Sequence, residues 1–362
     1  MNRTKQLSRV GQSIWLDNIT RDLLTGGTLE RYIKDLDVTG LTSNPAIYDK
    51  AIGGTGAYDA AIARLHEAGL DGETIFFELA IDDLSRAADL FLPIHKRTNG
   101  VDGFVSLEVS PTLANDTAAT IRDARRLHAQ AGRPNLFIKI PGTSAGLGAI
   151  EETVYSGVPV NVTLLFSTDQ YLAAAEAYTR AIERRVEAGL DPYVPSVASV
   201  FVSRWDGAEP TDLPADLHLQ LGVVTARKTF AAYRELIDGD RWQRLLNEGA
   251  RPQRLLWAST GTKDPKASDV YYIEALAAPF TVNTMPEETL LAFADHGSVG
   301  QTLAIGCDRG GEAILARFKS AGVDEAELAG RLQVKGVDAF ISSWNKLLGR
   351  IEEKTAIVSG RS

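Results

Sequence analysis

The 362-residue sequence contains a single cysteine, Cys307. One thiol cannot form a disulfide within the chain, and it excludes any zinc site built from several cysteines. Scarce cysteine is typical of proteins that work in a reducing compartment. At 44% hydrophobic residues, a chain of this length can instead form a large apolar core.

Long apolar runs and an excess of positive charge are also missing. No window approaches the ~18 consecutive apolar residues of a membrane-spanning helix, and the amino terminus lacks the apolar region of a signal peptide. The 38 Lys and Arg residues are outnumbered by 47 Asp and Glu, giving a net charge of −9. This balance argues against a surface for nucleic acid or anionic membranes. We therefore expect a soluble, cytoplasmic protein.

The sequence offers no motif for a cofactor. Its five histidines show no paired spacing of metal ligands. The glycine-rich stretch GTSAGLG, residues 142–148, lacks both the Gly-Lys-Ser/Thr ending of a nucleotide P-loop and the spacing of a dinucleotide fingerprint. We expect neither a metal nor an organic cofactor.

Short strand-like runs alternate with helix-period segments along most of the chain. The runs lie at residues 13–18, 38–45, 103–111, 136–143, 159–167, 195–205, 254–262 and 279–286. Alternating strands and helices indicate a parallel α/β fold, and eight strands favour a closed (β/α)₈ TIM barrel over an open doubly wound sheet. We predict one domain over residues 1–362, with residues 310–362 as C-terminal helices packing on the barrel. The apolar face of the last helix would consist of Phe340, Trp344, Leu347, Leu348 and Ile351. The Asp- and Pro-rich segment 205–220 is expected to be a surface excursion.

Residues along the strands alternate between apolar and polar. In the fifth strand Val160, Val162 and Leu164 alternate with Asn161 and Thr163. In a barrel, one parity packs against the helices and the other faces the axis, where it can be polar near the mouth. The polar residues with inward parity are Asp17, Asn44, Glu108, Lys139, Asn161, Thr163 and Ser199.

Lys139 stands in the middle of the apolar strand LFIKIPGT, which makes it the centre of this set. Desolvation is one way in which a lysine amine becomes a nucleophile for carbonyl carbons. Carboxylic acids beside such an amine can donate and accept the protons of Schiff-base chemistry. Taken singly, each residue also has a structural explanation: Asn44 could be a turn residue before Pro45, and Asp17 a loop cap. Convergence on one axis favours a shared chemical role.

Several motifs resemble those of transaldolase, specifically its longer bacterial type. They are TSNPAI, VSLEVSP, LFIKIPGT, VNVTLLFS and SVFVSRW, followed by ASTGTKDP and NTMPEETL. The resemblance covers nearly the whole chain. It implies a (β/α)₈ barrel enzyme of the pentose phosphate pathway, a transferase that works through a lysine Schiff base.

The resemblance also implies roles for individual residues. Lys139 would form the Schiff base, Glu108 and Thr163 would hold a catalytic water, and Asp17 would act as acid and base during cleavage. Asn44, Asn161 and Ser199 would contact the dihydroxyacetone unit. Arg204 would bind the substrate phosphate. Shorter transaldolases carry a second phosphate-binding arginine in the seventh strand's motif, whereas this chain has Ser-Thr-Gly-Thr-Lys. We assign that role to Lys263 with Ser259; the alternative is that Lys263 is a solvated loop lysine.

The predicted reaction moves a dihydroxyacetone unit from sedoheptulose 7-phosphate or fructose 6-phosphate to glyceraldehyde 3-phosphate or erythrose 4-phosphate. The partners would be these small sugar phosphates, with no nucleic acid and no membrane, and the protein would be a monomer or homodimer. One alternative is a related lysine aldolase that releases dihydroxyacetone to water. Another is a catalytically silent barrel, which the presence of Lys139, Glu108 and Asp17 disfavours.

Overall fold

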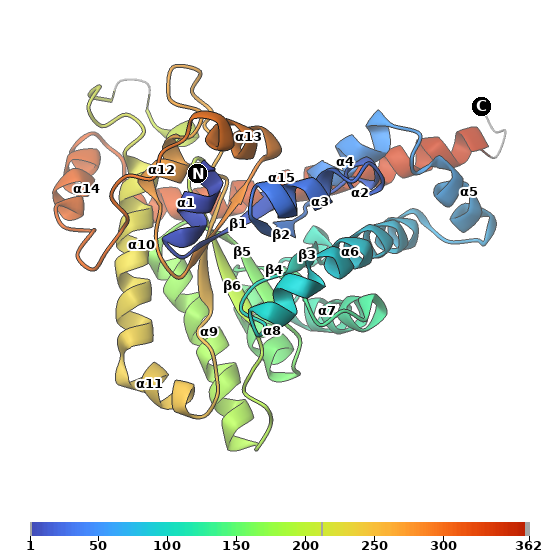
Figure 1. The fold of residues 1–362 in the computed structure, drawn as a ribbon, viewed down its shortest axis with the longest axis horizontal. Coiled ribbons are helices and arrows are strands. Elements are labelled where there is room, and N and C mark those ends of the chain that lie inside the picture. Colours follow the sequence, from blue (N-terminus) through green and yellow to red (C-terminus); the bar gives the residue numbers. More distant parts are fainter. Residues whose placement is uncertain (1, 211–212, 359–362) are drawn as a thin grey trace.

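The computed structural model describes residues 2–210 and 213–358. In this part of the chain eight parallel strands close into a barrel in sequence order, with β8 pairing β1 (Figure 1). The strands are β1 (Gln12–Asp17), β2 (Val38–Thr42), β3 (Val105–Glu108), β4 (Leu136–Pro141), β5 (Val160–Leu165), β6 (Ser196–Phe201), β7 (Arg254–Ala258) and β8 (Thr281–Met285). The predicted TIM barrel and all eight predicted strands are confirmed.

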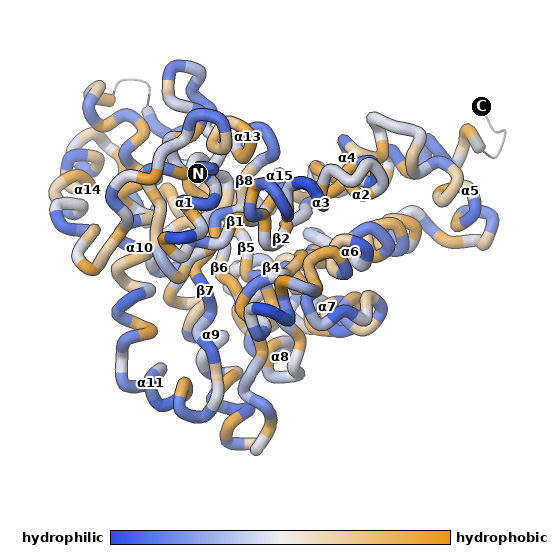
Figure 2. The backbone as a smooth tube through the Cα atoms, in the orientation of Figure 1, coloured by the Kyte–Doolittle hydropathy of each residue, from blue (hydrophilic) through white to orange (hydrophobic). Residues whose placement is uncertain are grey.

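Helices surround this barrel (Figure 1). They are α1 (Arg3–Arg9), α2 (Arg21–Thr25), α3 (Thr28–Asp35), α4 (Pro45–Gly54), α5 (Asp59–Glu67), α6 (Gly72–Arg97), η1 (Pro111–Leu113), α7 (Thr117–Ala131), α8 (Ser144–Tyr155), α9 (Thr168–Glu187), η2 (Asp206–Ala208), α10 (Leu221–Asp238), α11 (Asp240–Asn247), α12 (Tyr271–Ala275), α13 (Glu287–His296), α14 (Gly311–Ser320) and α15 (Glu325–Val358). Polar and apolar residues interleave along α6 and α10 (Figure 2), as expected of helices that bury one face. No described helix is long and apolar enough to cross a membrane.

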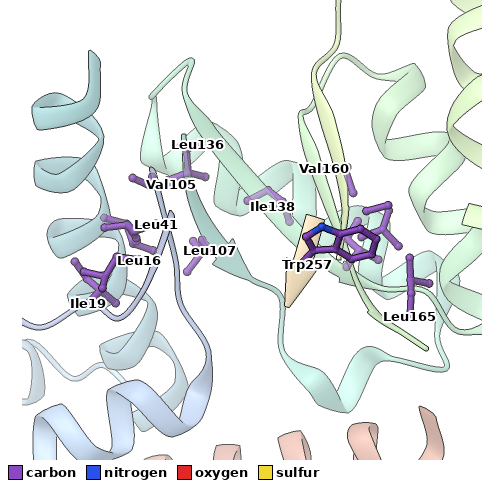
Figure 3. Packing of buried hydrophobic residues seen from close by; sticks show 14 of the residues in the cluster. Leu16, Ile19, Leu41, Val105, Leu107, Leu136, Ile138, Val160, Leu165 and Trp257 are labelled. Atoms are coloured by element: carbon purple, nitrogen blue, oxygen red, sulfur yellow. The ribbon is translucent and has the colours of Figure 1, made fainter. Parts of the chain in front are cut away.

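An outer apolar layer fills the space between strands and helices. It contains Leu107 of β3 and Ile138 of β4, with neighbours from other strands (Figure 3). These residues have the parity predicted to face the helices. The inside of the barrel is filled by a second apolar cluster, to which Trp15, Phe137 and Val197 contribute. The barrel is therefore a packed core that supports a site at one end.

One parity prediction was wrong. Leu164 was expected to face the helices with Val160 and Val162, but it belongs to the inner cluster, and Leu165 takes its place in the outer layer. The pairing of β5 with β6 shifts register between Val162 and Leu165, and Leu164 has a φ of 59°. This bulge adds one residue to β5 and so reverses the alternation at its end.

The C-terminal helix α15 lies over the mouth end of the barrel. Gln333 Nε2 donates to the carbonyls of Gly142 and Leu164, 3.0 Å from each, which ties the helix to the ends of β4 and β5. Further along, Trp344 is buried against Phe76 of α6, with ring centroids 5.0 Å apart. The helix thereby covers the mouth and packs against α4, α5 and α6.

The segment 205–220 is less superficial than expected. Trp205 is fully buried and Leu217 is buried, and both belong to the inner apolar cluster. Only residues 214–216 form an exposed run, while residues 211–212 lie outside the described part of the chain. The expectation of a surface excursion is therefore wrong for the ends of this segment, because two large apolar side chains anchor them.

Candidate active site

Lys139 lies in the middle of β4, where its side chain is buried inside the mouth of the barrel. Its Nζ donates to Glu108 Oε2 at 3.1 Å and to the Ser43 carbonyl at 3.0 Å. Glu108 is its register partner on the adjacent strand β3, so strand pairing itself brings the two charges together. The ammonium is thus desolvated but paired, which is how proteins keep a buried charge.

A cavity of about 220 Å³ opens above this pair at the carboxyl ends of the strands. Eight of the ten residues predicted for the site line it: Asp17, Asn44, Lys139, Thr163, Ser199, Arg204, Ser259 and Lys263. The other two lie directly behind the wall. Glu108 is held by Lys139, and the Asn161 amide accepts from Ser199 Oγ at 2.7 Å. The structure therefore brings all ten together.

Of the two carboxyl groups beside Lys139, Glu108 is buried and Asp17 is partly exposed to the cavity. Burial raises the pKa of Asp17, opposed by the positive charge of Lys139 and by a hydrogen bond of 2.7 Å from Thr42 Oγ1. Burial also raises the pKa of Glu108, opposed chiefly by the charge and hydrogen bond of Lys139. Carboxyls whose pKa is raised can hold a proton at higher pH than usual and return it, as acid–base chemistry requires.

Two oxygens at the site are buried without a hydrogen-bond partner among the described residues. They are Glu108 Oε1 and Thr163 Oγ1. Buried polar atoms are usually satisfied by protein or by ordered water. Asn44 differs, since its side-chain oxygen caps α4 by accepting from the Ile47 backbone N–H at 3.1 Å. Asn44 is therefore a helix cap and not the turn residue considered from the sequence, and its amide nitrogen takes no part in that cap.

The outer end of the cavity is cationic. Arg204 follows β6 and Lys263 follows β7, and both side chains are exposed to solvent. Neither makes an ion pair or hydrogen bond within the described part of the chain. Ser259, between them, shares a hydrogen bond of 2.9 Å with Ser203 and has a φ of 53°. Two unpaired cations at the rim are suited to an anionic group such as a phosphate.

Sequence reasoning missed several residues of the cavity wall. Thr42 and Thr284 share a hydrogen bond of 2.7 Å beside Asp17, and the inward parity of β2 and β8 could have found them. Phe340 was predicted only as a packing residue of the C-terminal helix, yet its ring centroid lies 5.6 Å from Lys139 Nζ. The Ser43 carbonyl gives no signal in a sequence, because every residue has one.

Metal-binding groups are not assembled in the described chain. No three His, Cys, Asp or Glu side chains within it are grouped as a metal ion would require. The polar side chains that line the cavity are instead two lysines, an arginine, one carboxyl, one amide and several hydroxyls, with the Glu108 carboxyl and the Asn161 amide behind the wall. Such a set can attack a carbonyl, move protons and bind a polyhydroxylated, anionic molecule.

Comparison with known proteins identifies relatives over the full length. The family model described as transaldolase/fructose-6-phosphate aldolase matches residues 14–351. The chain is 43% identical over 358 residues to the transaldolase of Arthrobacter sp. (strain FB24), with 96% of each chain covered. It is 42% identical over 360 residues to the transaldolase of Thermobifida fusca (97% of this chain, 98% of the relative). Transaldolase 2 of Nostoc punctiforme is 40% identical over 377 residues, with 99% of each covered.

Proposed function

The chain belongs to the transaldolase/fructose-6-phosphate aldolase family, and from this premise we propose that it is a transaldolase acting through a Schiff base on Lys139. Its relatives of similar length are named transaldolase and indicate a transferase. The observation that carries the proposal is the buried Lys139–Glu108 pair at the floor of a cavity whose rim is cationic.

The first half of the reaction forms the Schiff base. Lys139 Nζ passes a proton to Glu108, 3.1 Å away, and its lone pair attacks the ketone carbon of the donor. The resulting carbinolamine loses its hydroxyl as water after protonation, leaving an iminium on Nζ. A water held between Glu108 Oε1 and Thr163 Oγ1 would relay this proton, which would satisfy both unpartnered oxygens.

Cleavage and transfer follow. Asp17 removes the proton from the hydroxyl on C4, the C3–C4 bond breaks, and its electrons move to the iminium, giving an enamine and a free aldose phosphate. The enamine carbon then attacks the aldehyde of the acceptor, and Asp17 returns its proton to the new alkoxide. Hydrolysis of the new iminium releases the product ketose and restores Lys139. The raised pKa of Asp17 suits it to both directions of proton transfer.

The remaining residues of the cavity would bind the sugar phosphate. Asn44, Asn161 and Ser199 offer amides and a hydroxyl for the dihydroxyacetone unit. Arg204 and Lys263, with Ser259, would hold the phosphate. The proposed substrates are sedoheptulose 7-phosphate or fructose 6-phosphate as donor, and glyceraldehyde 3-phosphate or erythrose 4-phosphate as acceptor.

The proposal needs no metal, cofactor, nucleic acid or membrane. A cytoplasmic location and a place in the pentose phosphate pathway belong to it as well, supported by the free thiol of Cys307 and by the family. A monomer or homodimer would suffice, since every residue assigned to the reaction comes from one chain.

An aldolase that releases dihydroxyacetone is the second candidate, because the family description names such an activity. It shares Schiff-base formation and cleavage of the C3–C4 bond, so the fate of the enamine separates the two. In the structure Phe340 and α15 cover the cavity, which favours an aldehyde acceptor over water as the next reactant.

A transfer assay distinguishes the two candidates. The protein is supplied with fructose 6-phosphate in the presence and absence of erythrose 4-phosphate, and the products are separated. We expect sedoheptulose 7-phosphate in the first case and little free dihydroxyacetone in either. Free dihydroxyacetone formed as fast without acceptor as transfer with it would assign the chain to the aldolases. Lys139→Met, which removes the amine but keeps the apolar stem, should abolish both activities.

A further inference from the structure

A second cavity of about 420 Å³ adjoins the reaction cavity beneath α15. The two share Phe201, Arg204, Lys263, Ala339 and Phe340, so they meet at the cationic rim. Lys139 and Asp17 line only the inner cavity. Lys335 lines only the outer one. A ligand whose carbonyl carbon reaches Lys139 could therefore extend past Arg204 toward Lys335.

Three cations border this outer cavity, and none of them forms an ion pair or a hydrogen bond within the described chain. They are Arg204, Lys263 and Lys335. Other lysines of the chain do find carboxylates, as the half-buried Lys228 does with Glu325 at 3.4 Å. An exposed lysine without a partner is common and means little alone. Here, three like charges converge on one hollow, which costs electrostatic energy unless an anion lies between them.

The backbone that carries Lys335 is held firmly against the barrel. Two residues earlier, Gln333 donates to the carbonyls of Gly142 and Leu164. One residue later, Gly336 lies so close to β5 that a Cβ there would come within 2.9 Å of Leu164 Cδ2. This close approach, which glycine permits, fixes the start of the Lys335 side chain at the wall of the cavity.

The chemistry of transfer supplies a reason for a third cation. The acceptor aldehyde carbon takes the place of donor C4, so glyceraldehyde 3-phosphate and fructose 6-phosphate present their phosphates at the same distance from the reacting bond. Erythrose 4-phosphate and sedoheptulose 7-phosphate each carry theirs one carbon further out. A transaldolase must therefore bind phosphate at two depths along one channel.

We propose that Lys335 is a specificity-determining residue that binds the phosphate of the longer substrates, beyond the position served by Arg204 and Lys263. The proposal rests on the transaldolase function proposed above. The shorter pair would be held by Arg204 and Lys263 alone. The phosphates of sedoheptulose 7-phosphate and erythrose 4-phosphate would reach Lys335 in the outer cavity. They would gain a contact with Lys335 and lose part of their contact with Lys263.

The test compares four Michaelis constants in Lys335→Ala. We expect KM to rise about tenfold for the seven-carbon ketose phosphate and the four-carbon aldose phosphate, as for loss of a partly solvated charge-assisted hydrogen bond. KM for the six-carbon ketose phosphate and the three-carbon aldose phosphate should change less than about twofold. The value of kcat should be unchanged for all four substrates. Lys335→Arg, which keeps a cation, should restore the longer pair.

Lys346→Ala is the matched control, because Lys346 is exposed on the same helix and lines neither cavity. It should leave all four constants unchanged. Equal effects of Lys335→Ala on both pairs, or no effect on the longer pair, would overturn the proposal. The wild-type protein is assayed in parallel, and failure of that protein to transfer at all would instead refute the proposed function.

Discussion

At the scale of single residues, the proposed chemistry depends on a buried lysine that is paired with one carboxylate. Removing either partner of a buried pair leaves the other desolvated and unpaired, whereas an isosteric amide can still accept a hydrogen bond. Glu108 Oε1 and Thr163 Oγ1 are each buried without a hydrogen-bond partner among the described residues. In the proposed reaction the pair has both a structural role and a proton-transfer role, and substitutions can separate them.

Glu108→Gln should separate these roles. The amide oxygen can still accept from Lys139 Nζ, so the fold and the substrate KM should be retained within about threefold. Proton transfer is lost, which should lower kcat by about 10²–10⁴-fold. Steady-state kinetics would measure KM and kcat, and a thermal unfolding curve would measure whether the fold is retained. Unchanged turnover in a folded variant would remove Glu108 from the proton path.

Lys263→Ala tests the cationic rim. Loss of this charge should raise KM for fructose 6-phosphate about tenfold and leave unphosphorylated fructose, measured at high concentration, nearly unaffected. Lys266→Ala is the control, since Lys266 is an exposed lysine of the same loop that lines neither cavity. Equal losses with both sugars would show that Lys263 is a solvated loop residue.

Much of the residue-level site was predictable because it follows from strand parity. A buried strand with one charged residue drew attention to Lys139, and the same period located Asp17, Glu108 and Asn161 on the axis. The contribution of Phe340 was not predictable, since its helix lies about 200 residues away in sequence and its approach to Lys139 is set by tertiary packing. Backbone acceptors such as the Ser43 carbonyl carry no sequence signal at all.

At the scale of elements, α15 both closes the cavity and braces the fold. Its apolar stripe was predicted from the helical spacing of Trp344, Leu347 and Ile351, and these three side chains are indeed buried. The end of β5 was not predicted correctly, because a bulge at Leu164 interrupts the two-residue period. A local extra residue has no distinctive composition here, so periodicity alone could not reveal it.

Trp344→Ala should show how strongly α15 is held. The indole packs edge-on against Phe76, and its removal from a buried site should lower the free energy of unfolding by about 3–5 kcal/mol. Val334→Ala on the same helix, where the side chain is 62% exposed, should change it by less than about 0.5 kcal/mol. Denaturant unfolding of the two variants would measure these changes in the free energy of unfolding. Similar small losses would mean that α15 contributes little to stability.

At the scale of the whole molecule, closure of the sheet is what makes the site. Polar residues from strands far apart in sequence meet only because β8 pairs with β1. The barrel was predictable from eight alternating strands, since each local signal agreed with one architecture. The burial of Trp205 and Leu217 in segment 205–220 was not predictable, because Asp and Pro residues indicate a loop but not which of its apolar side chains are buried.

That segment should make the stability of the whole molecule depend on pH. Burial and the neighbouring Glu209 raise the pKa of Asp206 to about 8, far above its ordinary 3.8. The native state therefore keeps a proton that the unfolded chain has lost, so this contribution is complete below about pH 3.8 and disappears as pH rises through 8.

Asp206→Asn removes this titration while preserving shape. The gain in unfolding free energy of the variant over the wild-type protein should be larger at pH 8.5 than at pH 5. Denaturant unfolding midpoints of the variant and the wild-type protein at both pH values measure this gain. A difference between the two proteins that does not change with pH would show that Asp206 is not protonated in the native state.

The most direct measurement is borohydride trapping with fructose 6-phosphate, followed by peptide mapping. Reduction of the iminium should leave a stable secondary amine that carries the substrate carbons on Lys139, in the peptide containing LFIKIPGT. Lys139→Arg should give no adduct. One lysine should be labelled, and activity should be lost in proportion to labelling. An adduct on another lysine, or none while transfer proceeds, would contradict it.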